Sequence, residues 1–170
     1  MRRHDPQPMA DLELTRSTDD RRLYVLGEIG TLRVGGWFSR TATAQAGNRT
    51  WQFTGRGFWR RAVDAADESG VIAGQFEPRS LRRGGALGWG GREYALRPAS
   101  SWRERYALVD GDRELAILDG KGWGRRPVHV SVADPAIEPG LLLFAVFVVR
   151  GLAEDASSAG AGSVAATGGG

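Results

Sequence analysis

Short stretches in which apolar and polar residues alternate run along most of this chain. In one of them, Val128, Val130 and Val132 fall on the same side of an extended backbone, and polar residues stand between them. Asp110-Gly111-Asp112 separates two other stretches as a hairpin turn does. Glycines at close intervals mark further breaks, which is typical of an all-β sandwich or barrel. The pattern predicts about twelve short strands between positions 12 and 132.

The pattern changes after Pro139-Gly140, where the segment Leu141–Val149 (LLLFAVFVV) is entirely apolar. On a helix these side chains would cover every side instead of one stripe, which indicates a helix buried all round. The apolar character continues to residue 153, so the expected helix spans about 140–153. A buried strand is the alternative, because three of these residues are β-branched valines. A membrane span needs about 20 apolar residues, so this segment is too short to cross a bilayer.

These elements fit together in one architecture. A barrel of about eight strands is filled by its own side chains, whereas a larger barrel has room for a helix. The sequence therefore predicts a mainly β fold, a closed barrel of about twelve antiparallel strands around a buried hydrophobic C-terminal helix. We expect a polar, partly flexible lead-in over 1–20 and a single barrel domain over 21–155. The Ala-, Gly- and Ser-rich tail 156–170 is expected to be disordered.

Two strand pairs carry related turn motifs, Ala62–Phe76 (AVDAADESGVIAGQF) and Leu108–Leu118 (LVDGDRELAIL). With the order of the elements, strands first and apolar helix last, they resemble the tubby-like superfamily of tubby C-terminal domains, phospholipid scramblases and LURP-one-related proteins. The resemblance covers roughly residues 21–153. It implies a barrel that encloses its C-terminal helix, and it implies recognition of phosphoinositides through basic residues, as in tubby domains.

A pleckstrin-homology-like domain is the rival all-β architecture. Its C-terminal helix caps the barrel and is amphipathic, with one face in water. The segment 141–149 has no polar residue on any face. The number of expected strands is also too high for that fold, so the threaded barrel is favoured.

The charge composition excludes several classes of function. Lysine and arginine total 23 against 20 aspartate and glutamate, for a net charge of +3 and a pI near 9.9. Lys121 is the only lysine, and this preference for arginine indicates a GC-rich bacterial coding sequence more than nucleic-acid binding. Cysteine is absent and histidine occurs twice, which excludes disulfides, thiol nucleophiles and multi-histidine metal sites. No signal peptide is recognisable, so we expect a cytoplasmic location.

No motif for cofactor binding, metal binding or catalysis occurs in this sequence with the residue spacing that it requires. Asp110, Asp112 and Glu114 alternate as calcium ligands do, but Leu115 stands where the calcium loop needs glycine. The glycine cluster at 88–91 has neither the dinucleotide-binding spacing nor a phosphate-binding lysine. His129 lacks a recognisable nucleophile or acidic partner and is expected at the surface. The sequence therefore predicts no cofactor, no metal and no catalytic residue.

Arginines give the best candidate binding site. Residues 79–105 are strongly basic, and arginine beside aromatic residues binds phosphate headgroups or stacked bases. The candidate anion- or lipid-binding residues are Arg79, Arg82, Arg83, Arg92, Arg103 and Arg105. Arg60-Arg61 and Arg125-Arg126 add basic pairs beside tryptophans. The arginine-rich composition nevertheless favours the other interpretation, in which these arginines form a solvated barrel exterior.

The sequence thus predicts a non-catalytic binding or scaffold module without a transmembrane span. Its expected ligand is an anionic phospholipid headgroup or a partner protein, and nucleic acid is not expected. Two alternatives stay open. One is membrane association through an exposed 141–149 segment, and the other is an enzyme whose site at the barrel mouth has no recognisable spacing.

Overall fold

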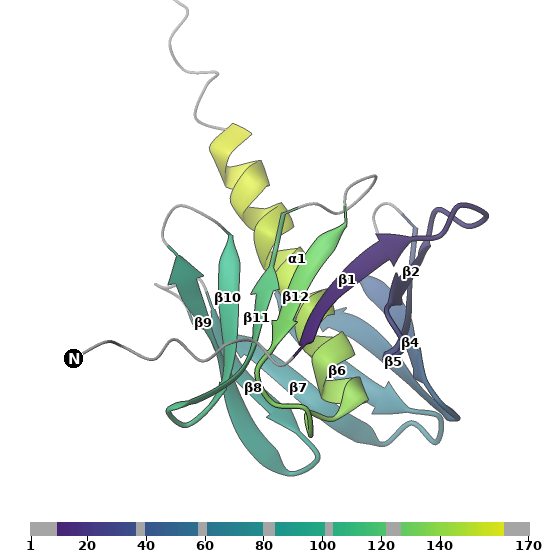
Figure 1. The fold of residues 1–170 in the computed structure, drawn as a ribbon, viewed down its shortest axis with the longest axis horizontal. Coiled ribbons are helices and arrows are strands. Elements are labelled where there is room, and N and C mark those ends of the chain that lie inside the picture. The colour runs from purple at the N-terminus through teal and green to yellow at the C-terminus, as the bar shows by residue number, and fades with distance from the viewer. Residues whose placement is uncertain are drawn as a thin grey trace, which may run out of the picture.

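Twelve antiparallel strands close into a barrel around one helix (Figure 1). The computed structural model describes residues 10–36, 40–57, 61–79, 84–100, 104–121 and 127–161. Within them, the elements in chain order are β1 (Ala10–Arg16), β2 (Leu23–Leu26), β3 (Gly30–Val34), β4 (Thr41–Ala46), β5 (Arg49–Arg56), β6 (Ala62–Asp67), β7 (Ile72–Pro78), β8 (Gly85–Trp89), β9 (Arg92–Ser100), β10 (Arg105–Asp110), β11 (Arg113–Asp119), β12 (Val128–Val132) and α1 (Pro139–Ala161).

The strands follow an up-and-down order, in which each strand pairs with the next one in the chain. The barrel closes where β1 pairs with β12, with Ala10 opposite Val132 and Leu14 opposite Val128. The predicted alternation is confirmed on β12, where Val128, Val130 and Val132 are buried and His129 is exposed. The predicted closed antiparallel barrel is therefore confirmed.

Helix α1 fills the interior of the barrel, as the apolar pattern predicts. Every residue of Leu141–Val149 is at most 7% exposed. The ring of Phe144 lies 5.1 Å from that of Phe53 on β5 and 5.6 Å from that of Trp89 on β8, measured between centroids. Small residues such as Ala44 on β4 leave space for the helix backbone. The alternatives of a buried strand and of an exposed membrane-binding segment are both wrong for this segment.

The start of α1 is tightly enclosed by aromatic side chains. Gly140 lies against the rings of Trp51 and Trp89, so closely that a Cβ placed on it would come within 2.5 Å of the Trp89 ring. Trp89 Nε1 donates a hydrogen bond of 2.6 Å to Glu138 Oε2, just before the helix. Arg49 also contacts Glu138 at 2.9 Å and lies over the ring of Trp51. These contacts seal the end of the barrel at which the helix enters.

The two ends of the barrel differ in their connections. We call one the turn end, because segments of two to four residues join β2–β3, β4–β5, β6–β7, β8–β9 and β10–β11 there. We call the other the loop end, where segments of four to eight residues join the remaining consecutive strands. Helix α1 begins at the turn end, low in Figure 1, and runs out through the loop end. Among the described residues, no helix is long and apolar enough to cross a membrane.

The barrel begins earlier and its helix ends later than the sequence predicts. β1 lies within the expected lead-in 1–20, because Leu14 is 1% exposed in the core and β1 is the strand that joins β12 to β2. Helix α1 continues to Ala161, so 156–161 of the expected disordered tail belong to it. Alanine is the best helix former and recurs in this part of the chain. Residues 1–9 and 162–170 lie outside the described residues.

Replacing Phe144 by aspartate should prevent the protein from folding in soluble form. Phe144 is fully buried, and an unpaired carboxylate in that position costs several kcal/mol, comparable with the whole stability of a domain at about 5–15 kcal/mol. The control Ile72→Asp introduces the same charge at a residue that is 49% exposed. Soluble expression and thermal melting of both variants check this prediction. A Phe144→Asp variant with unchanged melting would contradict the buried-helix arrangement.

Two glycines of α1 should respond in opposite directions to alanine. Gly140→Ala places a methyl group against two tryptophan rings, and such overpacking destabilises a core by about 1–3 kcal/mol. Gly151→Ala meets no atom within 4 Å and should stabilise the protein by roughly 0.5–1 kcal/mol through helix propensity. Urea unfolding of the two variants measures both changes. Equal effects of the two substitutions would show that Gly140 is not packed as described.

Candidate functional site

The structure distributes the predicted arginine site over both ends of the barrel. Arg79 follows β7 and Arg105 begins β10, so both lie at the loop end. Arg92 begins β9 and therefore lies at the turn end, on the opposite side of the molecule. Arg82, Arg83 and Arg103 lie outside the described residues. Arg92 is thus separated from Arg79 and Arg105 by the length of the barrel, since consecutive strands run in opposite directions.

Two of these arginines are already paired with carboxylates on neighbouring strands. Arg105 Nε donates to Asp119 Oδ1 at 2.7 Å, and this bond raises the pKa of Arg105 above its ordinary value. Arg92 Nη2 donates to Asp110 Oδ2 at 2.7 Å. The side chain of Arg79 is exposed, and its backbone N–H donates to the carbonyl of Gly84 at 3.0 Å. Arg105 and Arg92 therefore act as cross-strand partners on the barrel wall.

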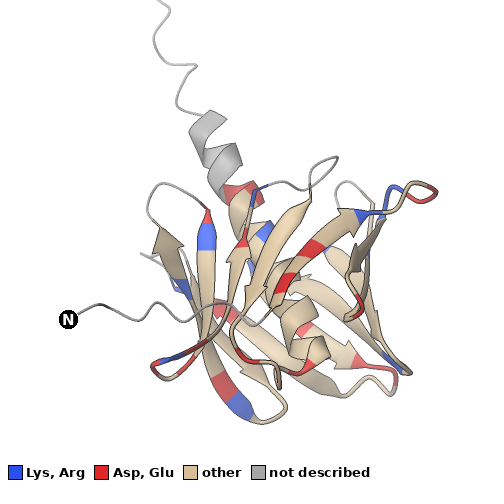
Figure 2. Ribbon diagram, viewed as in Figure 1, with Lys and Arg blue, Asp and Glu red and all other residues tan. Residues whose placement is uncertain are grey.

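The described charged residues are distributed unequally between the two ends of the barrel, although both signs occur at each end (Figure 2). We counted the described residues in the connections, in the two strand residues next to them and on α1. At the turn end, the acidic residues are Asp11, Glu28, Asp67, Glu68, Glu93, Asp110, Asp112, Glu114, Asp134 and Glu138. The basic residues found there are Arg49, Arg92 and Arg113.

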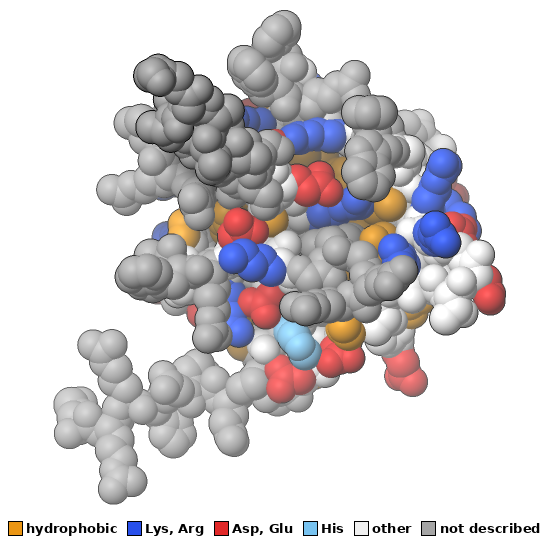
Figure 3. Space-filling model, turned by 90° about the horizontal axis from the view of Figure 1, so that it is seen from above, with side chains coloured by type: hydrophobic (Ala, Val, Ile, Leu, Met, Phe, Trp, Pro, Cys, Tyr) orange, Lys and Arg blue, Asp and Glu red, His pale blue; other side chains and the backbone are white. Residues whose placement is uncertain are grey.

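Basic residues predominate at the loop end in the same count. They are Arg16, Arg21, Arg22, Arg33, Arg40, Arg56, Arg61, Arg79, Arg105, Lys121 and Arg150. The acidic residues there are Asp19, Asp20, Glu77, Glu104, Asp119, Glu154 and Asp155. Figure 3 looks onto this end from above and shows blue arginine side chains with red carboxylates among them. The barrel therefore has an acidic turn end and a basic loop end.

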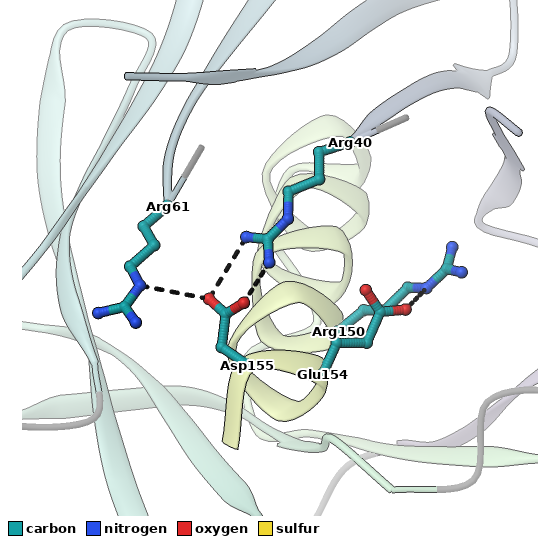
Figure 4. Close-up of polar contacts among 5 residues, drawn as sticks. All are labelled: Arg40, Arg61, Arg150, Glu154 and Asp155. Atoms are coloured by element: carbon teal, nitrogen blue, oxygen red, sulfur yellow. Dashed lines mark hydrogen bonds and ion pairs between the residues drawn. The ribbon is translucent and has the colours of Figure 1, made fainter. Parts of the chain in front are cut away.

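A cluster of partly buried charges lies at the loop end, where α1 leaves the barrel (Figure 4). Arg40 directly precedes β4 and Arg61 directly precedes β6, so the two arginines stand on either side of the end of β5. Asp155 of α1 lies between them. Its carboxylate accepts hydrogen bonds from both terminal nitrogens of Arg40, one of them 3.3 Å long, and its Oδ2 lies 3.7 Å from Arg61 Nε. We call these three residues the Arg40–Asp155–Arg61 cluster.

The cluster is more enclosed than an ordinary surface ion pair. The side chains of Arg40 and Asp155 are 29% and 22% exposed, whereas that of Arg61 is 58% exposed. On the same helix, Arg150 Nε donates to Glu154 Oε1 at 2.9 Å, four residues further along. This second pair is local to α1, while the cluster joins the helix to two separate loops.

Sequence reasoning missed most of this cluster. In the sequence, Arg61 stands out only as part of a basic pair beside a tryptophan, and Arg40 and Asp155 carry no motif. Arg40 and Asp155 are 115 residues apart in the chain, so no local pattern connects them. The length of α1 was the signal that could have found Asp155, because each further helical turn moves the chain outward from the core by about 5.4 Å.

The other candidate features of the described residues give no catalytic arrangement. His129 is exposed as expected, with its Nδ1 3.6 Å from Glu13 Oε1 on the neighbouring strand. No group of three or more acidic, histidine or cysteine side chains in the described ranges could hold a metal ion. A depression of about 400 Å³ lies on the outer wall of β7, β8 and β9, where Ala86 and Gly88 are small. Its lining mixes apolar, acidic and basic residues and shows no pair poised for acid–base chemistry.

No protein-family model matches this chain, and no match is found among the curated proteins or the solved structures. The resemblance to the tubby-like superfamily therefore stays a prediction that rests on the order of elements and the two turn motifs.

Asp20 at the loop end gives a pH-dependent prediction. A hydrogen bond from the backbone N–H of Arg22, at 2.9 Å, is the largest cause that lowers the pKa of Asp20, and Arg33 lowers it further. A lowered pKa in the folded protein stabilises it at pH values above the ordinary pKa of 3.8. This contribution disappears as the pH falls through the folded pKa. The difference in melting temperature between wild type and Asp20→Asn should therefore shrink between pH 7 and pH 3.

The variant Asp19→Asn removes the same charge from the same loop and corrects for the change in net charge. Melting curves across the pH series, recorded for all three proteins, make the comparison. A difference between wild type and Asp20→Asn that grows on acidification would contradict the assigned pKa direction.

Proposed function

We propose that this protein is a non-catalytic binding module whose loop end engages an anionic surface, with phospholipid headgroups as its ligand. The observation that carries this proposal is the separation of charge between the two ends of the barrel. Basic residues gather at the loop end, while the turn end is acidic and sealed by Trp51, Trp89 and Glu138. A module with this polarity has one orientation in which it approaches a negative surface favourably.

The interior of the barrel supports binding over catalysis. Among the described residues, the core consists of apolar side chains and contains no buried charged or polar residue. A catalytic pocket brings several polar groups together in a concavity. The alternative of an enzyme at the barrel mouth therefore finds no support in the described residues.

Physical chemistry favours a phospholipid surface as the anionic ligand. A basic residue close to an anionic leaflet contributes about 1 kcal/mol of attraction, and the attraction fades within a Debye length. Since α1 is buried, the contact would be peripheral.

The tubby-like resemblance adds to this proposal, because tubby domains recognise phosphoinositides through basic residues. It also supports a cytoplasmic location, where anionic lipids face the protein. A scaffold for a partner protein is the alternative within the same class, and the experiment below decides between them.

The test is co-sedimentation with vesicles across a salt series. Wild type should bind phosphatidylcholine vesicles that contain phosphatidylglycerol, should lose that binding as salt rises, and should not bind pure phosphatidylcholine. The variant Arg79→Gln/Lys121→Gln removes two exposed charges from the loop end and should weaken binding by about fivefold for each charge. The matched control Arg92→Gln/Arg113→Gln removes two charges from the turn end and should bind like wild type.

Equal loss in the two double variants would mean that net charge alone matters, and it would contradict an oriented loop-end surface. Equal failure of wild type to bind either kind of vesicle would contradict lipid binding and leave the scaffold function.

A further inference from the structure

We infer that Arg40 and Arg61 form a binding site for a phosphate monoester dianion, and that Asp155 occupies this site in place of the ligand. The inference deepens the proposed function, on which it rests for the phospholipid source of the phosphate. Arg40 and Arg61 recognise the phosphate group, and the carboxylate of Asp155 competes with it.

Two arginines from separate loops contact one carboxylate, Arg40 through both terminal nitrogens and Arg61 through its Nε at 3.7 Å (Figure 4). Arg40 comes from the β3–β4 connection and Arg61 from the β5–β6 connection, and the carboxylate of Asp155 contacts both. Two like charges that share a neighbour repel each other, so an anion between them is required for this arrangement to be favourable. Asp155 supplies that anion from within the chain.

The partial burial of Arg40 makes a neighbouring anion more favourable. Arg40 keeps 29% of its side-chain surface in contact with solvent, so water compensates its charge less than it does for a fully exposed arginine. The planar fork of a guanidinium group matches the oxygens of carboxylate or phosphate. The site therefore selects for an oxyanion with several acceptor oxygens.

The charge balance favours a dianion over the resident carboxylate. Two guanidinium groups carry two positive charges, and Asp155 neutralises one of them. The neighbouring Arg150 and Glu154 form a separate ion pair on α1. A phosphate monoester carries a charge of about −1.5 to −2 at neutral pH and offers three acceptor oxygens, so it fits both arginines better than one carboxylate does.

Asp155 can leave this position without loss of the core. The last buried side chain of α1 among the described residues is Ala153, and Leu141–Val149 fix the helix inside the barrel. Asp155 lies just beyond that anchored segment, and its side chain is 22% exposed. Exchange of its carboxylate for an external phosphate therefore breaks contacts at the loop end only.

The experiment measures inorganic phosphate binding to the full chain by isothermal titration at pH 7.5. Asp155→Asn removes the competing charge with almost no change in shape, and it should strengthen phosphate binding by about tenfold or more, the value of one charge-assisted hydrogen bond. The matched control Glu154→Gln removes an equal charge from the adjacent position and should bind like wild type. Adding Arg61→Gln to Asp155→Asn should abolish the gain.

Two vesicle arms identify the source of the phosphate. Phosphatidic acid presents a phosphate monoester, whereas phosphatidylglycerol presents a phosphodiester with a single charge. At matched surface charge, Asp155→Asn should prefer phosphatidic acid vesicles, and this preference should fade below about pH 6 as the monoester takes up a proton. Free phosphate binding without the vesicle preference would restrict the site to soluble phosphate compounds and would overturn the assignment to lipid.

A purely structural role of the cluster predicts different results. In that case Asp155→Asn lowers the melting temperature and gains no phosphate binding, which would overturn the inference. Equal gains in Asp155→Asn and Glu154→Gln would also overturn it, because net charge would then explain both. If Asp155→Asn fails to fold, Arg61→Gln alone still decides, since wild-type phosphate binding must fall when one of the two cations is removed.

Failure of this inference is distinguishable from failure of the proposed function. If wild type binds phosphatidylglycerol vesicles through Arg79 and Lys121 while the cluster variants behave alike, the proposed function stands and the phosphate site is wrong. If Asp155→Asn binds inorganic phosphate while no variant binds vesicles, the phosphate site stands and lipid binding is wrong.

Discussion

The mutual burial of one apolar helix and twelve strands is the constraint on which this molecule depends. A cylinder of this many strands is too wide for its own side chains to fill, and Leu141–Val149 supply the missing apolar atoms. This segment of the helix is in turn apolar on every face, so its exposure to water would be unfavourable. The barrel cannot pack without the helix, and the helix cannot remain in water without the barrel.

The two ends of the barrel differ because the helix enters at one end and leaves at the other. The up-and-down strand order places short turns at one end and longer loops at the other. The helix enters through the turn end, where Gly140 fits between Trp51 and Trp89 and Glu138 closes the entrance. The contacts that enclose the start of the helix therefore lie at the turn end, and the helix leaves the barrel through the loop end. The charge also differs between the two ends: among the described residues, acidic side chains predominate at the turn end and basic side chains at the loop end.

The sequence predicts the elements well because their signals are local. Alternation identified β12, and the unbroken apolar run identified α1. Boundaries were less accurate, because β1 depends on pairing with β12, which lies more than a hundred residues further along the chain. The positions of the arginines within 79–105 could not be predicted from the sequence, for a related reason. Whether Arg79 and Arg92 share an end of the barrel depends on strand direction, and strand direction is a property of the closed sheet.

The same helix that stabilises the barrel also controls the charge at its loop end. The buried segment Leu141–Val149 fixes the position of α1 along the barrel axis. The same packing therefore fixes the place at which Asp155 contacts Arg40 and Arg61. Moving the helix by one residue along its axis would shift that carboxylate by about 1.5 Å, enough to lose its hydrogen bonds. The packing of the core therefore sets the geometry of the basic cluster. A substitution deep in the barrel can thus change the contacts among Arg40, Asp155 and Arg61 without touching a charged residue.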